Sequence, residues 1–104
     1  MWISYDLGLR GDYEGLYSWL DSVGAKECGD SVAFFTKKVG SSLIDSIRED
    51  IKQHVKFNKT DRVYIIYLDD NTHKIKGTFL FGKRKRSSWE GYAIDHFSSD
   101  EDSL

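Results

Sequence analysis

The amino-acid sequence predicts a single α+β domain in which two helices cover one face of an antiparallel sheet. Apolar residues recur at helical spacing in two segments, residues 13–23 and 43–55. Runs rich in aromatic and β-branched residues lie around these segments, and the run at 62–68 is almost continuously apolar, as in a central strand. A chain of 104 residues supplies one modest core and not two.

The first half of the chain predicts a strand, a helix and a β-rich pair. The opening strand covers residues 2–7, and Asp12 is placed to cap the helix that follows it. Gly24 is well placed to end that helix, because glycine suits the C′ position. A short strand or a turn at 25–30 and a strand at 31–36 complete this half.

The second half predicts a helix and two strands. Ser42, with Asp45 three residues later, approximates a capping box at the helix start. A central strand at 62–68 is followed by turn chemistry at 69–72 and by a strand at 75–81. The predicted buried stripe of the helix is Leu43, Ile44, Ile47, Ile51 and Val55, its wet face is Arg48, Glu49, Asp50 and Lys52, and the single apolar side of the last strand is Ile75, Gly77, Phe79 and Phe81.

This order of elements predicts a ferredoxin-like fold, β-α-β-β-α-β with an extra C-terminal strand and two helices on one face of an antiparallel sheet. Two helices leave the other face of the sheet for solvent or a partner, and 14% aromatic residues favour a partner. We therefore expect a homodimer with a two-fold axis. The domain is predicted at residues 1–97, and the acidic residues 98–104 are predicted to be a disordered tail.

The composition excludes several classes of protein. A net charge of −2 gives no global attraction to nucleic acid, so any such binding needs a local patch. The lone Cys28 excludes an internal disulfide and, with three scattered histidines, a zinc finger. The chain has no apolar run of 18 residues and no signal-peptide pattern at its start. We expect a cytoplasmic protein without a membrane partner.

Asp6 is the leading candidate for a functional residue, because an acid is disfavoured inside a strand and here stands at its carboxyl end. It is the predicted catalytic and metal-binding residue of a nuclease, in which Mg²⁺ or Mn²⁺ neutralises the phosphate and activates water. Two symmetric Asp6 carboxylates would hold one such ion across a dimer axis. The competing interpretation is structural, with Asp6 accepting backbone N–H bonds from residues 8–12.

A basic segment is the candidate nucleic-acid contact. Residues 73–86 contain six Lys or Arg and no acid, which suits a phosphate backbone without sequence choice. Trp89 and Tyr92 follow and would stack on unpaired bases. A charged sheet edge that prevents aggregation is the alternative interpretation. The predicted nucleic-acid-binding residues are Lys74, Lys76, Lys83, Arg84, Lys85, Arg86 and Trp89.

Four short patches, at residues 3–7, 12–17, 31–35 and 88–92, resemble the SinR-like family, which is related to CRISPR-associated protein 2. The resemblance implies a two-fold dimer with a sheet-to-sheet interface. It also implies that Asp6 holds a divalent metal jointly with its symmetry mate, as proposed for catalytic members of the wider family. The first helix departs from the basic helix of many nuclease members, because Asp12, Glu14 and Asp21 make it acidic.

Two functions remain open from the sequence. The first is a non-catalytic homodimer that scaffolds nucleic acid or a protein partner, as in defence or toxin–antitoxin assemblies. The second is a divalent-metal-dependent nuclease that uses Asp6 and its mate. If the protein is an enzyme, the sequence predicts this nuclease activity. The first is favoured, because one carboxylate per chain is few ligands for a hard cation.

Overall fold

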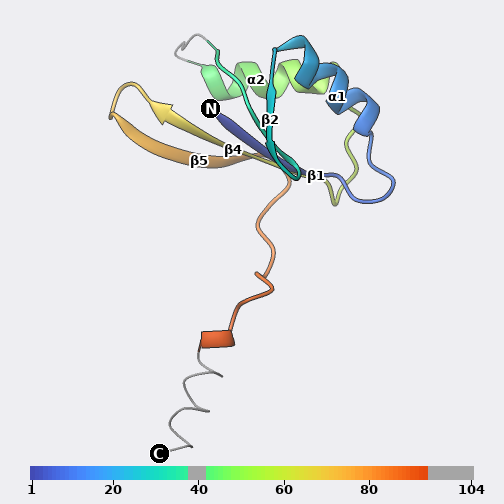
Figure 1. Ribbon diagram of the computed structural model, residues 1–104, viewed down its shortest axis with the longest axis vertical. Helices are drawn as coiled ribbons and strands as arrows, with labels where there is room; N and C mark the ends of the chain where they lie inside the picture. The colour runs from blue at the N-terminus through green and yellow to red at the C-terminus, as the bar shows by residue number, and fades with distance from the viewer. Residues whose placement is uncertain (38–41, 94–104) are drawn as a thin grey trace, which may run out of the picture.

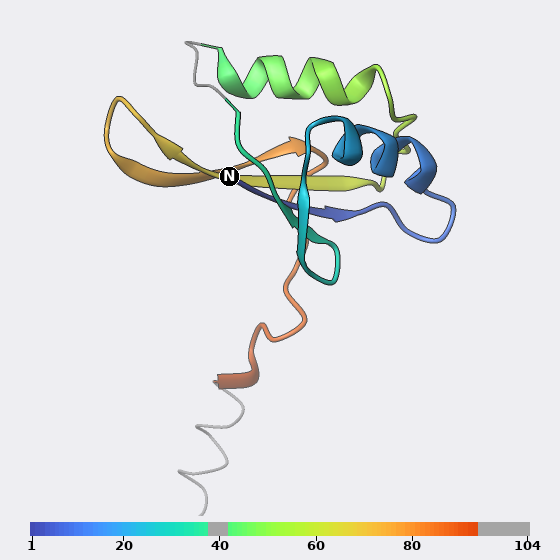
Figure 2. The ribbon, with the colours of Figure 1, turned by 45° about the horizontal axis from the view of Figure 1, so that its top comes forward.

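The computed structural model describes residues 1–37 and 42–93, and the predicted tail at 98–104 lies outside them. The strands follow the order β2-β3-β1-β4-β5, and all neighbouring strands run antiparallel. Both helices lie on one side of this sheet (Figures 1 and 2), which confirms the α+β class and is compatible with a ferredoxin-like fold. The elements are β1 (Trp2–Asp6), α1 (Tyr13–Ser22), β2 (Lys26–Gly29), β3 (Val32–Phe34), α2 (Leu43–Lys52), β4 (Arg62–Asp69) and β5 (Lys74–Phe81).

Helix α1 begins and ends as its sequence predicts. The Asp12 carboxylate accepts a hydrogen bond from the Gly15 backbone at 3.0 Å and another from the Lys56 backbone at 2.9 Å. At the other end Gly24 has φ of 69°, and its N–H bonds to the Asp21 carbonyl while the Ala25 N–H bonds to that of Leu20. These are the two bonds of a Schellman motif. The Asp12 cap also ties the start of α1 to the segment after α2.

Helix α2 differs from its prediction at three polar positions, Ser42, Arg48 and the half-buried Asp50. Ser42 is the N-cap residue, but its side chain makes no capping hydrogen bond, so the predicted capping box is wrong. Asp45 pairs instead with Arg48 at 2.8 Å. Arg48 was expected on the wet face, yet it is half-buried and its Nε donates to the Leu80 carbonyl at 2.9 Å. Its long side chain reaches β5, where the carbonyl needs a donor.

The core lies between the two helices and the sheet. Trp19 of α1 is its largest member and is 1% exposed. Its ring packs edge-on against Phe35 with centroids 5.4 Å apart, and its Nε1 donates to Asp50 of α2 at 2.8 Å. The buried apolar residues of α2 and of the turn after it are Leu43, Ile47, Ile51 and Val55, which confirms the predicted stripe except that Ile44 is half-buried.

Strand β5 keeps its predicted apolar side as far as Phe79, and this side lies away from the helices. In the ladder with β4, buried Ile65 stands opposite Thr78, while Ile75 is 71% exposed. Leu80, two residues after Thr78, lies on the same side of β5 and is 4% exposed in the core, and a register shift between Val63 and Tyr64 follows. The side formed by Ile75, Gly77 and Phe79 therefore faces away from the helices by simple alternation, and the bulge places Phe81 opposite buried Val63, where it packs against the core.

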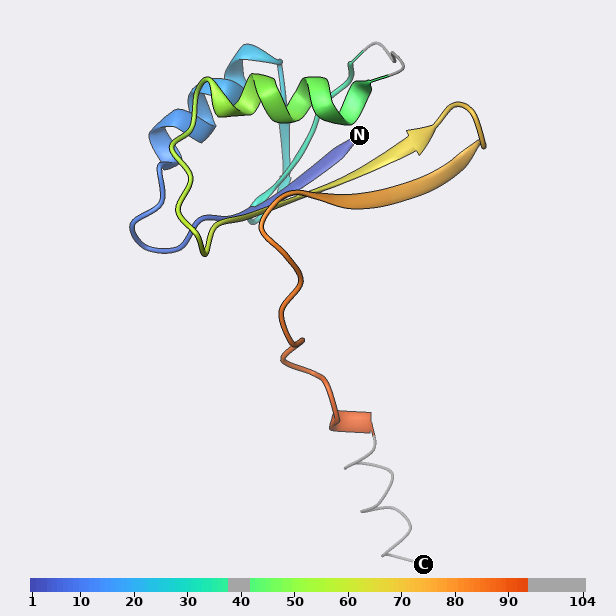
Figure 3. The same ribbon diagram turned by 180° about the vertical axis from the view of Figure 1, so that it is seen from behind.

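We call the sheet surface on the side away from the helices the open face. Among residues 1–37 and 42–93 no helix covers it, and residues 83–93 run away from the sheet on that side (Figures 1 and 3). The open face is thus where a partner or ligand can reach the sheet.

Neither helix of this part of the chain has the length and apolar content needed to cross a lipid bilayer.

We predict that Trp19→Ala lowers the free energy of unfolding by about 3–5 kcal/mol, because it empties the centre of the core and removes the partner of Asp50. Denaturant melts followed by circular dichroism measure this. Tyr92→Ala is the control, since Tyr92 is exposed and its loss should change stability by no more than about 0.5 kcal/mol. Equal losses in the two variants would contradict the described core.

Candidate functional site

Strand alternation places polar and aromatic side chains of β1, β4 and β5 together on the open face. Ile3 and Ile65 are paired and buried under the helices, so Ser4 with its partner Tyr64 lies on the opposite side. Asp6 faces Arg62 in the same ladder, and Phe79 of β5 pairs with Tyr64. Residues from three strands therefore meet at one end of the open face.

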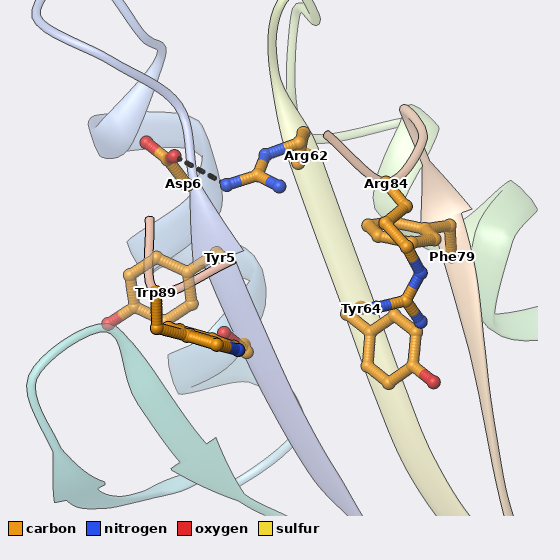
Figure 4. A pocket seen from close by; sticks show the side chains of 8 residues that line it. Tyr5, Asp6, Arg62, Tyr64, Phe79, Arg84 and Trp89 are labelled. Atoms are coloured by element: carbon orange, nitrogen blue, oxygen red, sulfur yellow. Dashed lines mark hydrogen bonds and ion pairs between the residues drawn. The ribbon is translucent and has the colours of Figure 1, made fainter. Parts of the chain in front are cut away.

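These side chains line a cleft of about 470 Å³ between the sheet and the segment that follows β5. The volume lies within the range of small-ligand sites, roughly 300–1,000 Å³. In Figure 4 Trp89 lies on the β1 side of the cleft, and Arg84 and Phe79 lie on the β5 side. The lining residues are Ser4, Tyr5, Asp6, Arg62, Tyr64, Phe79, Arg84 and Trp89.

Asp6 is paired within its own chain. An Nη2 donor of Arg62 bonds to the Asp6 carboxylate at 3.1 Å, and the Asp6 side chain is 55% exposed (Figure 4). This bond holds the pKa of the Asp6 carboxyl below its ordinary value; partial burial opposes the shift, while the Gly8 backbone and the charge of Lys85 add to it. Asp6 is therefore ionised at neutral pH and neutralised by a fixed cation.

The structural interpretation of Asp6 is supported in an unexpected form. The Gly8 N–H contributes, as the sequence suggested, but the main partner is Arg62. Within the described ranges no three His, Cys, Asp or Glu side chains come together as a metal site would need. In the described part of the chain the cleft thus offers a single, already paired carboxylate, which does not fit a hard cation that takes six or more oxygen ligands. A metal would need the second copy.

The six predicted basic residues do not form one surface. Arg84 lines the cleft, and Lys85 lies near enough to lower the pKa of Asp6. Arg86 pairs with Glu90 at 3.0 Å. The remaining three are placed differently: Lys83 is exposed after β5, whereas Lys74 and Lys76 lie opposite Asp69 and Tyr67 on the other side of the hairpin from the cleft.

Lys76 is held by its own ion pair. It bonds to Asp69 across the β4–β5 ladder, and this bond raises the pKa of Lys76 above its ordinary value while it lowers that of Asp69. The structure therefore brings Asp6, Arg84, Lys85 and Trp89 to one site and leaves Lys74 and Lys76 apart from it.

Five cleft residues were not predicted as site residues from the sequence: Ser4, Tyr5, Arg62, Tyr64 and Phe79. Tyr64 and Phe79 pack edge-on with ring centroids 4.8 Å apart. A signal for Arg62 was available, because the first residue of an antiparallel partner strand can stand opposite the last residue of β1. Because β4 is an almost continuous apolar run, its sequence does not show which side chains face the core and which, like Tyr64, lie on the open face.

The other end of the open face is apolar. Trp2, Ile66, Leu68 and Ile75 are all exposed there, and Leu68 and Ile75 stand opposite each other in the β4–β5 ladder. The Trp2 ring also packs on Phe34 of β3 with centroids 5.3 Å apart. We call the four exposed side chains the apolar patch. Contiguous exposed apolar surface of this kind marks association sites.

No protein-family model, curated protein or solved structure matches the chain. The resemblance to the SinR-like family therefore stays a prediction, and the function is argued from the site.

Proposed function

We propose that the protein is a non-catalytic homodimeric scaffold of the ferredoxin-like type that binds nucleic acid at the open face. The observation that carries the proposal is the Asp6–Arg62 pair inside a cleft whose other charged lining residue is Arg84. A nuclease of the kind the resemblance implies needs Asp6 free for a metal ion. Here the Arg62 guanidinium already pairs with the Asp6 carboxylate. With Arg84 the charged lining residues sum to a net positive charge, which suits phosphate.

The phosphate contact is assigned to the segment that follows β5. Lys83, Arg84 and Lys85 are exposed and come directly after the strand, beside the cleft. Each Lys or Arg that neutralises a phosphate releases a counterion, so such binding depends steeply on salt. The free, exposed Cys28 agrees with a reducing, cytoplasmic setting for this scaffold.

Homodimer formation is assigned to the apolar patch. A two-fold axis uses the same surface on both copies, so an apolar surface can meet itself without unpaired charge. The patch lies on the open face, and this agrees with the sheet-to-sheet dimer that the family resemblance implies. The same architecture would serve a defence or toxin–antitoxin assembly.

We predict that Leu68→Ser with Ile75→Ser converts the dimer to a folded monomer with an unchanged circular dichroism spectrum, since both side chains are exposed in one chain. Light scattering at micromolar concentration measures the mass. Leu9→Ser is the control, because Leu9 is fully exposed in a loop outside the patch. A starting protein that is already monomeric would reject the dimer.

We predict that replacing Lys83, Arg84, Lys85 and Arg86 together by Ser weakens nucleic-acid binding in low salt and lowers the slope of its salt dependence by about one unit for each phosphate that is no longer neutralised. Fluorescence anisotropy with labelled oligonucleotides measures both. The matched variant is Lys74→Ser with Lys76→Ser, on the other side of the hairpin. A starting protein that binds no oligonucleotide in low salt would reject the proposal.

A metal-dependent nuclease is the second candidate, and one observation favours it. Asp6 is 55% exposed at a cleft, so a second copy or a metal ion can reach its carboxylate. In that case Mg²⁺ or Mn²⁺ would be shared by the Asp6 carboxylates of two copies and would replace Arg62 as their partner.

This candidate makes its own prediction. Purified protein with Mn²⁺ should cut RNA or DNA, and Asp6→Asn should abolish the cutting while circular dichroism shows an unchanged melting temperature. The scaffold proposal expects no cutting by either protein and unchanged binding by Asp6→Asn. Cutting that survives Asp6→Asn would point to a contaminant and would reject the nuclease.

A further inference from the structure

We infer that the cleft holds an unpaired base of a single-stranded nucleic acid, stacked on Trp89. The inference rests on the proposed function and names the substrate class of the same site. It is carried by the kind of side chains that line the cleft, which are aromatic rings and arginines on three strands and one following segment.

The first step concerns the rings. Trp89 is 73% exposed although it lines a cleft, so most of its indole has no partner among residues 1–37 and 42–93. Across the cleft, Tyr64 and Phe79 form an edge-on pair with centroids 4.8 Å apart (Figure 4). A flat aromatic ligand would cover the indole and meet the edge of this pair. Bases meet this requirement, because each has a π-face.

The second step concerns the rigidity of the cleft floor. A Cβ at position 77 would collide with the phenol of Tyr64, so the Tyr64 ring lies over the bare backbone of Gly77. Gly77 stands opposite Ile66, two ladder positions from the Tyr64–Phe79 pair and on the same face. Because Gly77 has no side chain, the Tyr64 ring can pack against the backbone of β5. A ring held in this way loses little entropy when a ligand stacks or packs against it.

The third step concerns charge. Asp6 uses one Arg62 donor, and a guanidinium has five N–H donors, so Arg62 keeps others for a ligand. Arg84 lines the same cleft, and Lys85 is close enough to lower the pKa of Asp6. Cations next to stacking rings match a nucleotide, which carries a phosphate beside its base. An apolar peptide would leave these cations unpaired.

The fourth step excludes a duplex as the ligand of the cleft. In a double helix the faces of the bases are stacked on one another, so they cannot meet Trp89 unless the base leaves the stack. Single strands offer splayed bases at no such cost. Exposed aromatic rings on the open face of an antiparallel sheet are one of the ways in which proteins read single-stranded RNA.

The experiment compares four labelled oligonucleotides of equal length by fluorescence anisotropy in low salt: single-stranded DNA, single-stranded RNA, duplex DNA and an abasic single strand. The abasic strand keeps the phosphates and lacks the bases. We expect both ordinary single strands to bind more tightly than the duplex and the abasic strand. The RNA and DNA arms tell which sugar the site prefers, and either order supports the inference.

The variants locate the contact. Trp89→Ala should weaken single-strand binding about 5- to 150-fold and leave the affinity for the abasic strand unchanged, while Trp89→Phe should keep most of the affinity. Tyr92 was expected to stack beside Trp89, but it is an exposed aromatic that does not line the cleft, so Tyr92→Ala is the matched control. Circular dichroism of each variant shows that it is folded.

Two outcomes overturn the inference, and they are distinguishable from failure of the proposed function. Equal binding of the abasic and ordinary strands would leave phosphate contact standing and reject base stacking. Equal losses in Trp89→Ala and Tyr92→Ala would also reject the cleft as the stacking site. Absence of binding to all four oligonucleotides would reject both the scaffold function and its substrate class.

Discussion

The burial of both helices against the same face of the sheet is the constraint on which the rest of the structure depends. Trp19 of α1 and Ile47 and Ile51 of α2 fill the core on that side, so Ile3 and Ile65 must point toward them. Strict alternation then sends Ser4, Asp6 and their partners in β4 to the other face. The core and the candidate site are two consequences of one register, because a slip of one residue would exchange them.

Pairing with Arg62 changes which ligands the Asp6 carboxylate attracts or repels. An unpaired acid would repel phosphate and attract a metal ion, whereas an acid held by a guanidinium does neither strongly. Because Asp6 is more than half exposed, water screens the pair and it adds little to stability. Its effect is on the sign of the charge in the cleft: with Arg84 present the net charge is positive, which favours an anionic ligand.

The sequence predicted the fold better than it predicted the site, and the reason is periodicity. The caps at Asp12 and Gly24 and the apolar stripe of α2 are local patterns, and each was confirmed. The capping box at Ser42 was wrong because Asp45 found Arg48 as a partner. The predicted apolar side of β5 fails at Phe81 because the bulge beside Tyr64 depends on pairing between strands, which a single sequence does not display. Asp6, Arg84 and Trp89 were singled out from the sequence, but Arg62, Tyr64 and Phe79 joined them only through strand register.

The two proposed roles of the open face are compatible because they use different ends of β4. Arg62 begins this strand at the cleft, and Leu68 lies near its other end in the apolar patch. Six residues at about 3.3 Å each separate their Cα atoms by about 20 Å. A second copy that covers the apolar patch can therefore leave the cleft open, provided that it extends along the strands by less than this distance. A dimer that covered the whole face would instead bury Arg62 and Arg84 together, and two such pairs facing each other would repel across the axis. Electrostatic repulsion thus favours a dimer centred on the apolar patch, with one open cleft at each end.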